Sequence, residues 1–245
     1  MKHSRSSAEV EIRDAVVARL RELRPDARIV HELNVDEGMN RVDVAAIGRD
    51  RIVFVEIKSE RDKPHRLARQ LHAFGPCCHA LILAAHEKWF ASPGTERKVR
   101  RVHKVRVPQQ DPDTGMMTLV PGTIEDWYNV HLPSPMQLLL AEFPHWGIAE
   151  WQYPPPDGHR RWELQRYDWH RPWADKLLHL LWRNELVAVC DRLRVACSPR
   201  AARSDLIAAI VQVARCLEIE AEVCHALRGR EFAEADAPIV EGARA

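Results

Sequence analysis

The N-terminal third of the chain alternates between helical and strand-like patterns of hydrophobic and polar positions. Between residues 8 and 24 an apolar residue recurs at every third or fourth position, and the pattern ends before Pro25. This spacing predicts an amphipathic helix with one buried face, and Ser6 or Ser7 is suited to its N-cap.

Shorter apolar runs follow with the alternation that is typical of strands. The polar pair Arg49-Asp50 separates two of them, and Asp62 is suited to cap a later segment with helical spacing and a proline in its first turn. The pattern predicts strands at 28–35, 41–48 and 51–58, then a helix at 64–74 and a strand at 80–85. We therefore expect an α/β fold in which a mixed sheet is flanked by helices.

Composition divides the rest of the chain into segments. Ten of the 16 prolines and six of the eight tryptophans fall between residues 108 and 173, so regular structure should be sparse there. Helical periodicity returns from Ala174, and the last residues are acidic and small. The changes predict an α/β core over 1–107, a Trp- and Pro-rich connector or arm over 108–173, a small helical module over 174–232 and a loose tail over 233–245.

Charge and apolar content narrow the class of protein. The 36 Lys and Arg nearly balance the 35 Asp and Glu, which excludes a globally basic nucleic-acid coat but leaves local basic patches open. No run approaches the roughly 20 apolar residues of a membrane helix, and the chain starts with a charged segment rather than an apolar signal core. The six cysteines include no Cys-x-x-Cys pair, which favours free thiols in a reducing compartment over a zinc site. We expect a cytoplasmic protein.

The predicted hairpin between residues 41 and 58 carries an unusual set of charges. With its turn at 48–51, the strand register places Asp43 opposite Glu56. Alternation puts Lys58 on the same face as Glu56, whereas most of the aliphatic residues point to the other face. Directly opposed carboxylates repel each other, and a divalent cation between them would remove that repulsion.

These residues fit a metal-dependent phosphodiesterase. Asp43, Glu56 and the carbonyl of Ile57 are hard oxygen ligands of the kind that Mg²⁺ accepts, with Mn²⁺ as a substitute. Lys58 would orient the attacking water or stabilise negative charge in the transition state. The alternative is an exposed edge hairpin with a Glu–Lys ion pair, but such a hairpin would not carry aliphatic residues so heavily on both faces.

The same residues resemble the PD-(D/E)XK nuclease superfamily, in which an Asp on one strand and a Glu-x-Lys on the next form a metal site on a restriction-endonuclease-like α/β core. The matching positions are Asp43 and Glu56-Ile57-Lys58. The following residues, with Arg66-Leu67 and Gln70-Leu71, are similar to a bacterial and phage subgroup of largely uncharacterised members. The resemblance covers roughly residues 8–90, and a valine stands where the family usually has a proline before the Asp.

Further candidates lie outside this motif. The resemblance implies an acidic metal residue on the first helix, and Glu9 rather than Glu11 falls on the apolar stripe, although the helix dipole alone would also favour a glutamate there. It also implies a glutamine near the site. Gln70 either takes this role or is a plain surface residue, and the two alternatives are equally open. Glu32 would be an acidic site residue or a strand-edge glutamate, and Arg41 would hold a phosphate or neutralise the predicted aspartate.

A basic segment indicates a nucleic-acid partner. Residues 96–106 hold six Lys or Arg with valines between them, which suits contact with backbone phosphates and equally suits a solvated edge strand. The candidate phosphate contacts are Arg41, Arg97, Lys98, Arg100, Arg101 and Lys104. Residues 185–213 loosely resemble a helix–loop–helix DNA-binding module of the SAP type, a leucine spacing that any small helical hairpin shares.

The sequence thus predicts a Mg²⁺-dependent (endo)deoxyribonuclease that has no membrane segment, and cutting both strands of a duplex would favour a homodimer. Two alternatives stay open. One is a noncatalytic DNA-binding or scaffold protein that keeps the nuclease fold. The other is a protein-interaction module that uses the Trp- and Pro-rich segment.

Overall fold

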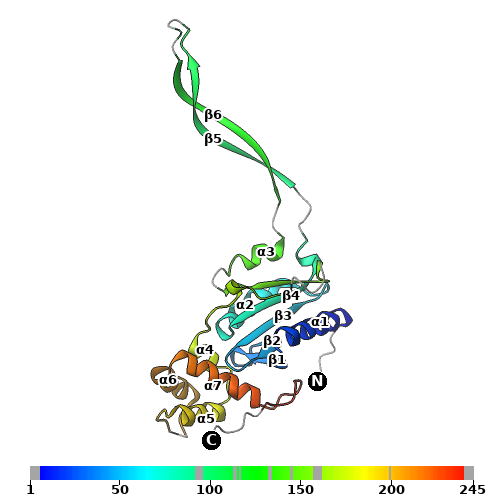
Figure 1. Cartoon of the computed structure of the whole chain (residues 1–245), viewed down its shortest axis with the longest axis vertical. Coiled ribbons are helices and arrows are strands. Elements are labelled where there is room, and N and C mark those ends of the chain that lie inside the picture. The colour runs from blue at the N-terminus through cyan, green and yellow to red at the C-terminus, as the bar shows by residue number, and fades with distance from the viewer. Residues whose placement is uncertain are drawn as a thin grey trace. The chain divides into compact units, whose positions relative to one another are not determined.

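The computed structural model describes residues 6–91, 96–112, 115, 117–131, 134–143, 146–156, 162–198 and 200–239. The chain forms two compact units, one of Met1–Trp89 with Leu139–Ala245 and one of Phe90–Leu138. The first unit holds a five-stranded sheet with helices on both faces (Figure 1), which confirms the predicted α/β class. Its strands are β1 (Arg28–Val35), β2 (Asn40–Ile47), β3 (Ile52–Lys58), β4 (Ala80–His86) and β7 (Ala149–Tyr153).

The sheet has the strand order β1-β2-β3-β4-β7 and is mixed. The pairs β1–β2 and β2–β3 are antiparallel, whereas β3–β4 and β4–β7 are parallel. Ile47 pairs with Ile52 and Val44 with Val55, so the predicted hairpin register is confirmed. β7 completes this sheet although it comes from the segment that was expected to lack regular structure.

Helix α1 (Ser7–Leu23) covers one face of the sheet. It begins where predicted, because the Ser6 hydroxyl accepts the N–H of Glu9 and so caps the first turn. Its apolar stripe is buried among side chains of the sheet, and each such residue stabilises the fold by roughly 1.5–3 kcal/mol. Two tryptophans of the Trp-rich segment belong to the same core, since Trp151 and Trp162 are buried and stacked at 5.1 Å.

Helix α2 (Leu67–Phe74) packs against the other face, where Phe74 meets Phe54 edge to face at 6.2 Å. A short 3₁₀ turn, η2 (Pro64–Arg66), leads into it. The prediction that Asp62 caps this helix is wrong. Its carboxylate instead accepts the N–H and the hydroxyl of Ser59 and closes the loop after β3. Among the described residues of this unit, four further 3₁₀ turns lie outside the main elements: η1 (Asp36–Gly38), η3 (Gly75–Cys77), η4 (Glu87–Trp89) and η6 (Arg166–Asp168).

The second unit is a two-stranded antiparallel ribbon of β5 (Glu96–Gln110) and β6 (Met117–His131), followed by the short helix α3 (Pro135–Leu140). The expectation of sparse regular structure over 108–173 is therefore wrong for β6, as it is for β7. Prolines do not prevent strand formation here, because both strands of a two-stranded ribbon are edge strands and edge strands tolerate proline. The compact units accordingly divide the chain differently from the predicted ranges.

Four helices follow in the first unit: α4 (Ala174–Leu178), α5 (Arg183–Leu193), α6 (Arg203–Val213) and α7 (Cys216–Gly229). They confirm the predicted helical module, but with two corrections. The spacing of Leu177, Leu181 and Val189 predicts one helix at the start of this module, but the structure divides these residues between α4, the turn after it and α5. Ser204 is suited by residue type to cap the second helix, but it lies inside α6, which starts after Ala202 and has no side-chain cap bond.

The segment after Phe232 was expected to be loose, and this is wrong for the described residues up to Ile239. Ala235 forms a bridge with Val30 on the open edge of β1. The amide of Asp236 donates to the Ile29 carbonyl at 2.9 Å, and its carboxylate accepts the Ile29 N–H at 2.9 Å. The chain end thus supplies partners to an edge strand that would otherwise leave its amides unpaired.

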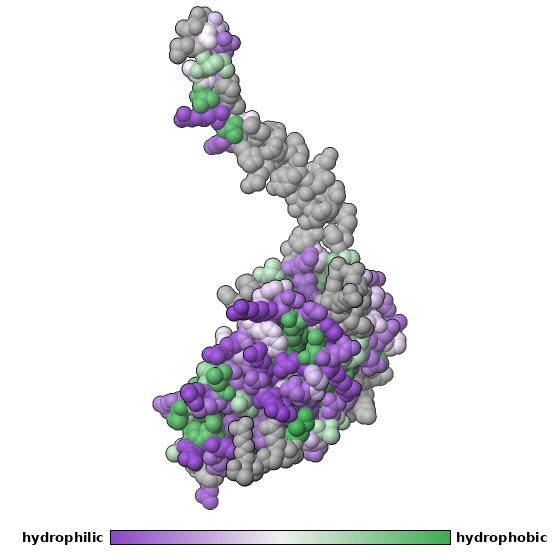
Figure 2. Space-filling model, viewed as in Figure 1, coloured by the Kyte–Doolittle hydropathy of each residue, from purple (hydrophilic) through white to green (hydrophobic). Residues whose placement is uncertain are grey.

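The face of the first unit seen in Figure 2 is mostly hydrophilic, with small hydrophobic patches that include one over the C-terminal helices at the lower left. Val211, Val213 and Leu217 are exposed residues of α6 and α7. Among the described helices, none has both the length and the apolar content that crossing a bilayer requires.

Candidate active site

The β2–β3 hairpin brings the predicted motif residues together in space. Asp43 lies one position beyond the Val44–Val55 pair, on the side away from the hairpin turn, and its Oδ2 accepts the N–H of Ile57 at 2.7 Å. Glu56 and Lys58 are both buried. The Lys58 Nζ donates to Glu56 Oε1 at 2.5 Å and to Gln70 Oε1 at 3.2 Å. Four of the predicted catalytic residues therefore form one cluster between the sheet and α2.

Glu56 is the least satisfied charge of this cluster. Its Oε2 is buried and has no hydrogen-bond partner among the described residues. Burial raises the pKa of Glu56 to about 8, and the charge of Asp43 adds to this rise while Lys58 opposes it. Burial therefore makes the charged form of Glu56 costly, and a further positive charge beside it would favour that form.

The pKa values of two neighbouring groups, Asp43 and Lys58, are also shifted. Burial also raises the pKa of Asp43, although Arg13 and the N–H of Ile57 partly offset it. For Lys58, burial lowers the pKa, but the charge and the hydrogen bond of Glu56 outweigh burial and raise it overall. Lys58 is therefore a protonated donor at neutral pH.

Arg13 is a member of the cluster that the sequence analysis did not identify. It lies on α1, is 3% exposed, and donates to the Asp43 carbonyl at 2.5 Å and to Asp43 Oδ1 at 3.2 Å. It also bonds Glu9 at 2.9 Å and Glu32 at 3.3 Å. The signal was its place in the helical pattern: one position after Ile12, it falls on the apolar stripe, where an arginine needs buried partners.

The candidate acidic residues Glu9 and Glu32 reach the site through Arg13. Glu9 was preferred to Glu11 because of its helix face, and it does lie on the side of the cluster while Glu11 is exposed. Glu32 has a left-handed backbone (φ 55°) inside β1, a conformation that glutamate rarely adopts. Arg41 contacts Glu32 at 3.1 Å rather than the predicted aspartate.

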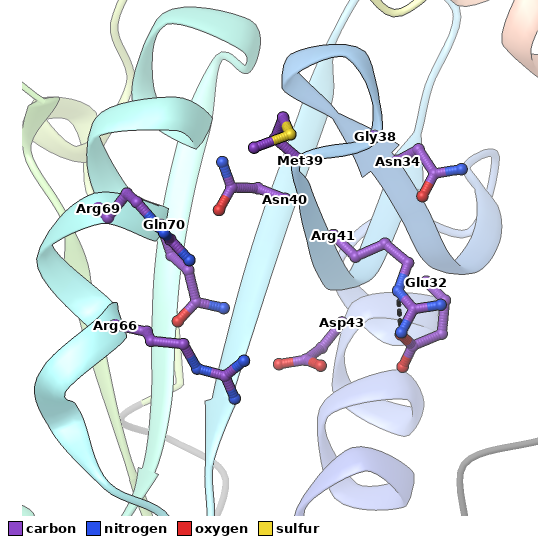
Figure 3. A pocket seen from close by; sticks show the side chains of 10 residues that line it. All are labelled: Glu32, Asn34, Gly38, Met39, Asn40, Arg41, Asp43, Arg66, Arg69 and Gln70. Carbon is purple, nitrogen blue, oxygen red and sulfur yellow. Dashed lines mark ion pairs between the residues drawn. The ribbon is translucent and has the colours of Figure 1, made fainter.

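A polar pocket of about 360 Å³ opens next to Asp43. Figure 3 shows Arg66, from the η2 turn before α2, extending toward Asp43, with Gln70 beside it and Arg41 paired to Glu32. The pocket is lined by Glu32, Asn34, Gly38, Met39, Asn40, Arg41, Asp43, Arg66, Arg69 and Gln70. Arg66 and Arg69 were not identified as site residues from the sequence. For Arg66 the available signal was its position four residues before Gln70, a spacing that places two helical side chains on one face.

The remaining phosphate candidates lie on β5. Lys104 is exposed there. The backbones of Arg97, Lys98, Arg100 and Arg101 belong to the same strand, and their side chains lie outside the described part of the structure.

The two carboxylates can be tested as ligands for the divalent cation that the motif implies. The unpartnered Glu56 Oε2 next to Asp43 is an oxygen that a hard cation would satisfy, so the donors fit Mg²⁺. Within the described residues, no cluster of three or more His, Cys, Asp or Glu side chains is suited to a metal. Further ligands would therefore come from the main chain, as expected of the Ile57 carbonyl, and from water.

Comparison with known proteins gives one match. A family model described as bacteriophage P4 protein cII matches residues 2–96, which span α1 to β4 and include Asp43, Glu56 and Lys58. No curated protein and no solved structure matches the chain. The first part of this chain is thus similar to a phage protein family whose description names no activity.

Proposed function

We propose that this protein is a metal-dependent nuclease that hydrolyses phosphodiester bonds in DNA. The observation that carries the proposal is the buried, unpartnered oxygen of Glu56 beside Asp43, which lines a pocket with three arginines. Arg13 and Lys58 each pair with one of these carboxylates, but the second oxygen of Glu56 stays without a partner among the described residues, and burying it in this way is costly. A site that combines two buried carboxylates, one of which has a free oxygen, with arginines suits a cation on one side and a phosphate on the other.

Each residue of the cluster has a role in this proposal. Asp43 and Glu56 would hold Mg²⁺ or Mn²⁺, with the Ile57 carbonyl as a main-chain ligand. When bound, the ion would supply Lewis-acid stabilisation and lower the pKa of a water molecule. Lys58 is fixed by Glu56 and Gln70 and stays protonated, so it would act by donating a hydrogen bond to the water or to a phosphate oxygen, and not as a general base.

Arg13 would fix the position of Asp43. It holds both the main-chain carbonyl and one carboxylate oxygen of that residue, and Glu9 and Glu32 in turn hold Arg13. Glu9 would thus support the site through Arg13 rather than as a direct ligand. Arg41, Arg66 of η2 and Arg69 of α2 supply the positive wall of the pocket that a nucleic-acid backbone requires. The proposal places the protein in the cytoplasm, and cleavage of both strands of a duplex would favour a homodimer.

The test is cleavage of linear, circular, single-stranded and branched DNA by the wild type and by Asp43→Ala and Lys58→Ala, with Mg²⁺, Mn²⁺ or EDTA. Cleavage should require metal, and each variant should lose at least about 100-fold in rate. Asp14→Ala and Lys63→Ala remove an exposed aspartate and an exposed lysine and serve as matched controls. Equal cleavage by Lys58→Ala and the wild type would remove the site assignment.

One observation favours a second candidate, a noncatalytic DNA-binding protein with the same fold. Arg13 already places a positive charge 3.2 Å from Asp43 Oδ1, and this charge offsets part of the negative charge that a bound metal ion would neutralise. In that case DNA would bind equally well in EDTA and in Mg²⁺, and no substrate of the panel would be cut.

A further inference from the structure

A second hollow borders the pocket at Asp43. It has a volume of about 550 Å³ and shares Glu32, Asn34 and Gly38 with that pocket, so the two meet at the end of β1. Its other walls include residues between α4 and α5, among them Leu181 and Trp182. The first hollow is polar, whereas the second adds apolar and aromatic side chains.

Two arginines of the first pocket are available for a ligand. Arg66 and Arg69 are exposed, and neither has an ion pair or hydrogen bond with a described residue. The other arginines of the two hollows differ, since Arg41 pairs with Glu32 and Arg203 binds Glu37 and main-chain carbonyls. A phosphate that enters the first pocket would therefore meet Arg66 and Arg69 without breaking an existing pair.

Trp182 offers a flat surface in the second hollow. It is 57% exposed, and the guanidinium of Arg230 lies over its ring at 4.5 Å from the centroid. Arg230 is itself fixed by Glu185 and by the Leu180 carbonyl, which it contacts at 2.8 Å. The indole is thus held on one side by a rigid neighbour and is open to solvent elsewhere, which suits stacking against a base.

We infer that the two hollows form one binding path for single-stranded DNA. Arg66 and Arg69 hold phosphates next to the one that is cleaved, and Trp182 stacks on an unpaired base further along the strand. A duplex keeps its bases stacked inside and offers Trp182 no such face, so the substrate has a single-stranded segment beside the cleavage point. The identity of the cleaved phosphate rests on the proposed function, whereas the binding of the strand does not depend on it.

The experiment measures binding in EDTA, where cleavage cannot interfere. A labelled DNA strand of about 12 nucleotides and the blunt duplex of the same sequence are titrated with the full chain by fluorescence anisotropy. The wild type should bind the single strand more tightly, and Trp182→Ala should weaken that binding roughly 5- to 150-fold while leaving the duplex unchanged. Arg66→Ala and Arg69→Ala should each reduce the slope of log affinity against log salt by about 0.7.

Matched variants separate stacking from damage to the fold. Trp173→Ala removes a tryptophan of equal exposure (56%) that lines neither hollow, and Arg215→Ala removes an exposed arginine at the start of α7. Both should bind like the wild type. Trp182→Phe keeps an aromatic face and should restore most of the affinity, which a merely unfolded variant could not do.

The outcomes also separate this inference from the nuclease proposal. Equal affinity for strand and duplex, or an equal effect of Trp182→Ala and Trp173→Ala, would overturn the inference even if the protein cuts DNA. The expected binding pattern without any metal-dependent cleavage would support the path and remove the nuclease proposal. Tighter binding of an RNA strand of the same sequence would overturn the choice of DNA.

Discussion

Two buried charged groups of the sheet, Arg28 on β1 and Glu56 on β3, differ in how completely their hydrogen-bonding groups are satisfied. Arg28, at the start of the strand, is 1% exposed and donates to the carbonyls of Leu227, Arg228, Arg230 and Asp236. Glu56, in the cluster with Asp43, is equally buried but leaves one oxygen without a partner among the described residues. Both charged groups are therefore buried, but of the two only Glu56 has an oxygen left to bind a ligand.

This difference shows what each group does in the molecule. A buried guanidinium that donates to four main-chain carbonyls holds α7 and the segment after it against the sheet, and it stabilises one packing arrangement. A buried carboxylate without a full set of partners lowers the stability of the fold, and natural proteins retain such groups at functional sites. Substitution should therefore affect stability at Arg28 and activity at Glu56.

The largest expected effect is on cleavage by Glu56→Gln. The amide keeps the shape of the side chain but removes the charge that would bind the metal, so the rate should fall by roughly 100- to 1000-fold. Stability at pH 8 should change little, because the lower cost of burying a neutral amide is offset by the loss of the buried ion pair with Lys58. Initial cleavage rates and urea unfolding of the same preparation measure both quantities, with the exposed Glu60→Gln as control. A large loss of stability together with normal cleavage would reverse the assignment of roles.

The complementary change is Arg28→Met. It leaves several buried carbonyls, including those of Leu227 and Arg230, without donors, and we expect the free energy of unfolding to fall by about 3–5 kcal/mol. Arg21→Met removes an exposed pair with Asp236 and should cost less than about 1 kcal/mol. Urea titration at constant pH distinguishes the two, and similar small losses would show that the buried arginine is not structural.

A third prediction concerns pH. The pKa of Glu56 is about 8 in the folded protein and near 4.5 in the unfolded chain. Unfolding therefore releases a proton when the pH lies between about 4.5 and about 8. In metal-free buffer this group therefore makes the protein less stable as pH rises from about 4.5 to about 8, by at most roughly 1.4 kcal/mol per pH unit. Thermal unfolding at a series of pH values should show the decline in the wild type and a smaller one in Glu56→Gln. Mg²⁺ should reduce the decline in the wild type alone.

The hairpin and its face assignments could be predicted from the sequence because they are local. Two apolar runs around Arg49-Asp50 fix a turn, and alternation with a period of two then decides which side chains share a face. The positions of Asp43, Glu56 and Lys58 relative to one another follow from that register alone. Helix α1 was predictable for the same reason, since its cap and its stripe are both encoded within 18 residues.

The parts that were missed depend on contacts between distant segments. β7 joins β4 more than 60 positions later in the chain, and the docking of Asp236 on Ile29 crosses 207 positions. Arg13 was not identified because a single arginine within a helix reads as exposed until its partners on β1 and β2 are known. No local pattern contains such pairings, which are decided by the packing of the whole unit.

The smallest expected effect comes from a substitution in the segment around Ala235 and Asp236, which docks on the edge of β1. Asp236→Ala removes the carboxylate that accepts the Ile29 N–H and pairs with Arg21, so the free energy of unfolding should fall by about 1–2 kcal/mol. The more specific measurement is hydrogen exchange at the Ile29 amide, which should become faster while amides in β3 keep their protection. Asp205→Ala, a change to an exposed first-turn residue of α6, is the control and should leave Ile29 unaffected. If Asp236→Ala also leaves that amide protected, the edge of β1 does not depend on the chain end. Arg28 would then hold α7 without help from the segment that follows it.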